Sequence, residues 1–83
     1  MSNTPQEEAA ERFGELIRLH GDDFRDNSAL CLAADAETRR LGQAVDQARY
    51  ERDELTASFY NHMATEFTHL FSYVKKSVLA SSR

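Results

Sequence analysis

Residues 55–79, LTASFYNHMATEFTHLFSYVKKSVL, decide how the rest of the chain folds. Apolar side chains recur in this stretch at steps of three and four residues, which places them along one face of an α-helix. Between Leu55 and Val74, Glu66 is the only side chain with a full charge. We expect so apolar a helix to contact protein on more than one side. The repeating residues are Phe59, Met63, Phe67, Leu70, Phe71, Val74 and Val78.

The composition predicts one small all-α domain. The chain has 83 residues, with three glycines and one proline, and this usage favours helices over a sheet. Its formal charge is −4, and the basic residues form no long run, so we expect no nucleic-acid partner. Cys31 is the only cysteine, which excludes an intramolecular disulfide. No segment is apolar enough to predict a membrane span or signal peptide, so we expect a cytoplasmic location.

The first helix is marked by its N-terminal residues. Thr4-Pro5-Gln6-Glu7 matches the capping box, in which a hydroxyl caps the helix, proline occupies the first turn and a glutamate reaches back. Gly21 is suited to the position just after a helix. We therefore predict a helix at about residues 5–20 and a loop at residues 21–27.

The second half of the chain lacks ordinary turn signals. After residue 27 there is no proline, and Gly42 is the only glycine. The apolar residues also keep one phase at about 100° per residue across this region. We therefore predict one long helix at about residues 28–79, roughly 75 Å in length. The alternative is a helical hairpin or three-helix bundle that breaks near residues 50–56, with Asp53 or Thr56 as the new N-cap.

Such a long helix predicts a dimer. A first helix of about sixteen residues covers only about a third of the long apolar stripe. We therefore expect a short N-terminal helix folded back on one long helix, with two chains assembled as a homodimeric helical bundle. The expected dimer core consists of Leu41, Val45, Leu55, Phe59, Met63, Phe67, Leu70 and Val74.

One group of residues has the spacing of metal ligands. His62, Glu66 and His69 are four and three residues apart and share one edge of a helix. Glu66 and His69 also fit the Glu-x-x-His spacing of metal sites in helical bundles. A metal-binding bundle is therefore an alternative function. The more economical interpretation is that these side chains make hydrogen bonds beside the apolar stripe, and we predict no cofactor.

Another alternative is a DNA-binding modulator. It would act through Arg39, Arg40, Arg49 and Arg52. These arginines alternate with Glu37, Asp46, Glu51 and Asp53, which is typical of a solvated helix face.

The function that we favour is that of a small non-enzymatic protein-interaction module. No Gly-rich phosphate loop and no recognisable grouping of nucleophile and base occurs in the sequence. The aromatic surplus suits a helix that binds another protein and regulates or inhibits it. Small acidic accessory proteins of the phage- or plasmid-encoded type have this character. The candidate partner-binding residues are Tyr50, Tyr60, Phe71 and Tyr73.

Overall fold

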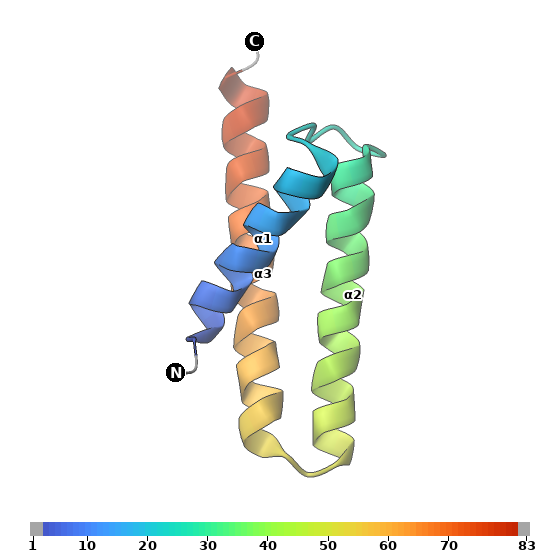
Figure 1. The fold of residues 1–83 in the computed structure, drawn as a ribbon, viewed down its shortest axis with the longest axis vertical. Helices are drawn as coiled ribbons and strands as arrows, with labels where there is room; N and C mark the ends of the chain where they lie inside the picture. Colours follow the sequence, from blue (N-terminus) through green and yellow to red (C-terminus); the bar gives the residue numbers. More distant parts are fainter. Residues whose placement is uncertain (1–2, 82–83) are drawn as a thin grey trace.

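The computed structural model describes residues 3–81, and within them the chain forms three α-helices. They are α1 (Pro5–His20), α2 (Ala29–Tyr50) and α3 (Glu54–Ser81). Helices α2 and α3 run antiparallel as a hairpin, and α1 crosses α3 on one side of it (Figure 1). The bundle measures 47 × 25 × 20 Å. The predicted all-α class is therefore confirmed.

Helix α1 has the bounds that its capping box predicts. The hydroxyl of Thr4 accepts a hydrogen bond from the backbone N–H of Glu7 at 3.1 Å, and Pro5 occupies the first turn. At the other end, the N–H of Gly21 donates to the carbonyl of Ile17 at 2.7 Å. Gly21 has a φ of 85°, a backbone conformation that residues other than glycine rarely adopt.

The continuous helix predicted over residues 28–79 is wrong, and the hairpin alternative is correct. Helix α2 ends at Tyr50 and α3 begins at Glu54. Arg52 takes a left-handed conformation with a φ of 59°, and the N–H of Asp53 donates to the carbonyl of Ala48 at 2.9 Å. Asp53 then caps α3, because its Oδ1 accepts from the N–H of Thr56 at 3.1 Å. A left-handed arginine and a capping aspartate thus replace the glycine and proline that usually mark a turn.

The loop between α1 and α2 is anchored by Phe24, which is only 2% exposed. Ser28 caps α2, since its Oγ accepts from the N–H of Cys31 at 3.2 Å. The buried Cys31 thiol donates in turn to the carbonyl of Phe24 at 3.4 Å. Lys75 of α3 also reaches this loop, where its Nζ lies 2.8 Å from Oδ1 of Asp26. The loop therefore holds the top of α3 against the start of α2.

The centre of the core is a group of four phenylalanines that come from α1, from α3 and from the loop between α1 and α2. The ring of Phe13 in α1 lies 6.2 Å from that of Phe67 and 6.1 Å from that of Phe71, both edge to face. Phe24 lies 6.4 Å from Phe13 and 5.6 Å from Phe71. These separations suit aromatic pairs, which add to the energy of burial. Phe13 is the member that joins α1 to the rest.

Much of the predicted dimer core lies in the core of a single chain. Leu41, Met63 and Phe67 are 1% exposed, and Val45 is buried as well. Phe59, Leu70 and Val74 are half-buried and pack against this core, whereas Leu55 is 86% exposed. Because α2 and α3 cover one another, the premise that a second chain must cover a long helix no longer holds.

Replacing Phe13 by alanine should destabilise the fold by about 3–5 kcal/mol, because it leaves a cavity among three other rings. For a domain of this size the melting temperature should fall by more than about 12 °C. Thermal unfolding followed by circular dichroism measures this. Leu19→Ala on the same helix is the control, since Leu19 is 58% exposed. Equal losses in both variants would contradict the proposed role of Phe13.

Candidate interaction surface

The most exposed large hydrophobic residues flank the turn between α2 and α3. Among the described residues, Leu55 is 86% and Tyr50 is 85% exposed. Tyr50 is the last residue of α2, and Leu55 lies in the first turn of α3. We name residues 49–55 the hairpin tip. Other large hydrophobic residues with substantial exposure are Leu19, Leu32, Tyr73 and Leu79.

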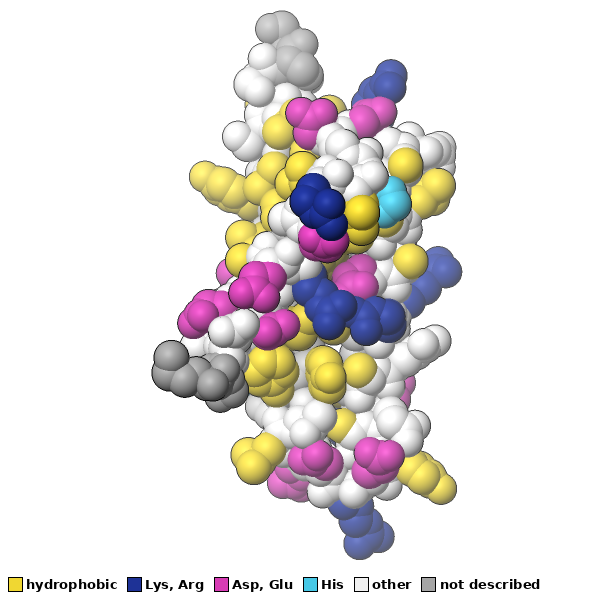
Figure 2. All heavy atoms as spheres, in the orientation of Figure 1, with side chains coloured by type: hydrophobic (Ala, Val, Ile, Leu, Met, Phe, Trp, Pro, Cys, Tyr) yellow, Lys and Arg dark blue, Asp and Glu magenta, His cyan; other side chains and the backbone are white. Residues whose placement is uncertain are grey.

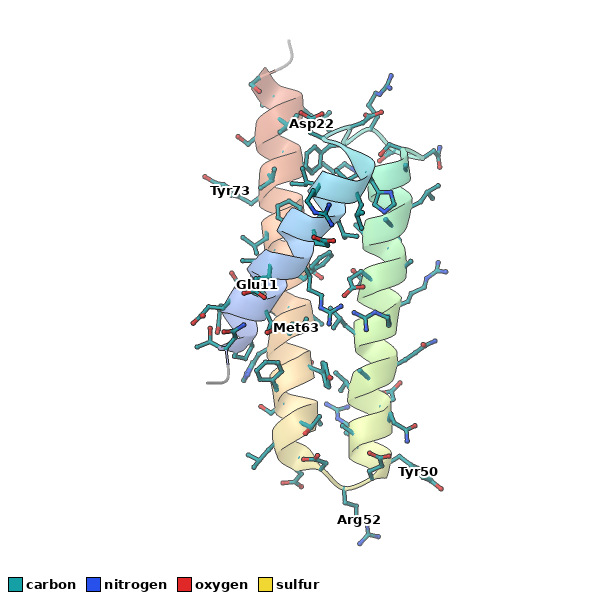
Figure 3. The ribbon with its side chains drawn as sticks, viewed as in Figure 1. Glu11, Asp22, Tyr50, Arg52, Met63 and Tyr73 are labelled. Atoms are coloured by element: carbon teal, nitrogen blue, oxygen red, sulfur yellow. The ribbon has the colours of Figure 1, made fainter. Side chains whose placement is uncertain are left out.

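The hairpin tip projects beyond the part of the bundle that α1 covers (Figure 1). Tyr50 and Arg52 point outward from it, away from all three helices (Figure 3). The turn itself is short and held by backbone hydrogen bonds, including those from Arg52 to Arg49 and from Asp53 to Ala48. The tip therefore presents its side chains on a well-defined backbone.

The four residues predicted to bind a partner fall into two groups. Tyr50 and Tyr73 are 85% and 75% exposed. Tyr60 is half-buried, with its ring 6.0 Å from that of Phe59 in an edge-to-face contact. Phe71 is half-buried in the aromatic core, so little of its ring is available to a partner. Leu55 was assigned to the dimer core instead. Its place two residues after the capping Asp53 is the sequence signal for its exposure.

The predicted metal-ligating residues do not form a three-ligand site in this chain. His62 and His69 are exposed, and Glu66 is partly buried. Within residues 3–81, no three His, Cys, Asp or Glu side chains lie close enough together to hold a metal ion.

The four arginines of the DNA-binding alternative do not act as one group in the structure. Arg40 donates through Nε to Glu37 at 3.0 Å, and this partner raises the pKa of Arg40. Nη1 of Arg12 lies 3.3 Å from the same carboxylate, which links α1 to α2. Arg49 and Arg52 lie instead at the hairpin tip. Basic and acidic side chains are interleaved on the face shown in Figure 2.

Two surface hollows differ in character. One, of about 440 Å³, is lined by Glu8, Glu11, Arg12, Glu15, Leu16 and Glu37 on α1 and α2. The other, of about 580 Å³, is mainly apolar and is lined by Ser72, Tyr73, Lys75, Lys76 and Leu79 on α3. The first hollow is thus acidic, and the second combines an exposed tyrosine with two lysines.

No protein-family model matches the sequence, and comparisons with curated proteins and with solved structures give no significant match. Among residues 3–81, no helix has the length and apolar character needed to cross a bilayer.

Removing the cap of α3 should lower stability in a pH-dependent manner. Hydrogen bonds from the Thr56 hydroxyl and N–H lower the pKa of Asp53. A lowered folded-state pKa stabilises the fold above the unfolded value of about 3.9, and this stabilisation is lost as the pH falls through the folded value. Asp53→Ala should lower the melting temperature at pH 7 by about 4–8 °C.

The loss caused by Asp53→Ala should shrink as the pH is lowered below about 4, because the wild-type carboxylate is then protonated. Asp53→Asn is the control, since asparagine caps helices without a titrating charge. Melting curves of the three proteins between neutral and acidic pH measure the effect. A loss that stays constant with pH would contradict capping by the carboxylate.

Arg52→Gly should stabilise the protein, because glycine adopts the left-handed conformation without the steric cost that a β-carbon incurs. The expected gain is about 1 kcal/mol, or about 4–8 °C in melting temperature. Arg52→Ala removes the charge but retains the β-carbon, so it should leave the melting temperature nearly unchanged. A gain in the alanine variant equal to that in the glycine variant would assign the effect to charge instead.

Proposed function

We propose that this protein is a non-enzymatic interaction module that binds another protein through its hairpin tip and changes that protein's activity or availability. The observation that carries the proposal is the exposure of Tyr50 and Leu55, at 85% and 86%. Single exposed hydrophobic residues are common on protein surfaces. Here two of the largest exposures occur within six residues of each other, at one end of an elongated bundle.

The residue types at the tip support this proposal. Tyrosine and arginine are enriched among the residues that contribute most to protein–protein binding, and the tip contains Tyr50, Arg49 and Arg52. Both arginines alternate with the carboxylates of the turn, so the apolar side chains stand among charges of both signs. A suitable partner surface is an apolar depression with a polar rim, into which Tyr50 and Leu55 insert.

The backbone of the tip favours binding for a second reason. Association loses free energy when flexible segments must become ordered. The turn is only three residues long and is closed by the Asp53 cap and by hydrogen bonds to α2. Little backbone ordering remains for the partner to impose, so more of the contact energy contributes to affinity.

We place this activity in the cytoplasm. Cys31, the only cysteine of the sequence, is a free thiol and is buried. A free thiol is typical of proteins in a reducing compartment, where disulfides are rare.

The first test identifies the partner by site-specific cross-linking. A photo-reactive amino acid replaces Tyr50 in one protein and Leu32 in another, and each is exposed to lysate of the source cells. Leu32 is a suitable control because it is also exposed, at 57%, but lies in the first part of α2. We expect a protein that cross-links from position 50 and not from position 32. Equal cross-linking from both positions would contradict binding at the tip.

The second test measures affinity for that partner. Tyr50→Ala and Leu55→Ala should each raise the dissociation constant about tenfold or more, as expected for buried anchor residues. Leu19→Ala and Leu32→Ala should change it by no more than about twofold. Isothermal titration with purified proteins measures these values, and circular dichroism checks that each variant is folded. Unchanged affinity in both tip variants would refute the proposal.

A further inference from the structure

The chain exposes more surface than a compact monomer of its mass. A monomer of 9.5 kDa is expected to expose about 5,000 Å². This chain exposes 6068 Å², an excess of about 1,000 Å². Its radius of gyration is 13.8 Å, compared with about 12 Å for a compact domain of this length. A stable dimer buries about 800 Å² on each partner, so the excess is large enough for such a contact.

Part of the apolar surface along the C-terminal half of α3 remains accessible. Leu70, Val74 and Val78 recur at four-residue steps, and each packs against the core on one side while staying partly exposed on the other. Tyr73 is 75% exposed and points away from the other two helices (Figure 3). We name these four residues the α3 strip. Helix α1 crosses α3 below this level and turns towards α2, so no helix covers that side of the upper part of α3 (Figure 1).

Charges of opposite sign lie at the two ends of the same edge. Lys76 lines the hollow beside Tyr73, and it has no ion pair with a described residue. Glu7, Glu8 and Glu11 lie in the N-terminal half of α1 and likewise form no ion pair within residues 3–81. Acidic side chains gather beside that end of α1, and hydrophobic ones lie along the edge above them (Figure 2). The edge is therefore basic at one end, apolar in the middle and acidic at the other end.

We propose that two copies of this chain form a dimer through the α3 strip, with their α3 helices antiparallel about a two-fold axis near Leu70 and Tyr73. A two-fold contact requires a surface that is complementary to itself. In the antiparallel arrangement the Lys76 end of each copy faces the acidic end of α1 on the other, and the apolar strips meet between them. A parallel arrangement would place lysine against lysine and glutamate against glutamate, which costs energy. The hairpin tip is at the other end of α3, so this contact leaves the proposed partner-binding surface free.

The oligomeric state tests the proposal directly. Light scattering on a sizing column, from low micromolar to several hundred micromolar protein, should give twice the chain mass of 9.5 kDa. Tyr73→Glu should raise the dimer dissociation constant about tenfold or more, because it places a charge in the middle of the apolar contact. Tyr50→Glu is the matched control at the hairpin tip and should leave the dimer intact.

Circular dichroism separates loss of pairing from loss of folding, since Tyr73 is not part of the core and both variants should keep the helical signal. A folded wild-type chain that stays at 9.5 kDa at every concentration would refute the proposal. So would a dimer that Tyr73→Glu does not weaken, because pairing would then use another face. A monomer that still binds a partner through the tip would overturn the dimer alone.

A charge exchange tests the orientation. Lys76→Glu should weaken the dimer about three- to tenfold, because each rim contact occurs twice by symmetry. Combining Lys76→Glu with Glu11→Lys should restore at least part of the loss, whereas Glu11→Lys alone should weaken the dimer. Failure of the combination to restore pairing would contradict the antiparallel arrangement.

Cross-linking gives an independent measure of orientation. Tyr73→Cys places a thiol close to the proposed axis, and two copies should form a disulfide there under mild oxidation. Ala80→Cys lies two turns further along α3, so antiparallel helices would hold its two copies apart, while parallel helices would bring them together. The wild-type chain is the background control, since Cys31 is buried. A disulfide from Ala80→Cys as strong as that from Tyr73→Cys would refute the antiparallel dimer.

Discussion

Reversal of the chain between α2 and α3 depends on one left-handed residue. Arg52 turns the backbone, and Asp53 starts the next helix by accepting the N–H of Thr56. This connection lets the two longest helices cover one another, which buries Leu41 and Met63 within a single chain. If the helix had continued through residue 52, the same apolar residues would have required a second chain.

The position of α1 decides which surfaces remain available. Phe13 fixes α1 to the middle of α3 through contacts with Phe67 and Phe71, and Phe24 extends the same group from the loop. A helix of sixteen residues cannot also cover the ends of one of twenty-eight residues. The hairpin tip and the side of α3 that carries Tyr73 therefore stay exposed towards opposite ends of the bundle. Under the two proposals, this separation would let one end bind a different protein while the other binds a second copy.

Part of the candidate site could be recognised in the sequence. Tyr50 and Tyr73 do not belong to the main apolar repeat, and both are strongly exposed. The sequence placed Phe71 on the partner-binding surface and Leu55 in the dimer core, whereas Phe71 is half-buried and Leu55 is exposed. Phe71 is half-buried because α1 and the loop bring Phe13 and Phe24 against it, and neither contact is local in sequence. Leu55 is exposed because α3 begins only at Glu54, so it lies in the first turn of α3 at the end of the hairpin.

Local signals by themselves determined the all-α class, the bounds of α1 and the apolar face of α3. Capping side chains and the spacing of apolar residues act within a few residues, so they can be read without knowledge of the fold. The tertiary structure decided whether α2 and α3 are one helix or two. Both arrangements place the same apolar stripe against protein, and their periodicity is therefore the same. The left-handed conformation of Arg52 has a steric cost, and the packing of α2 on α3 offsets it. The free energy of that packing comes from contacts between residues far apart in the chain.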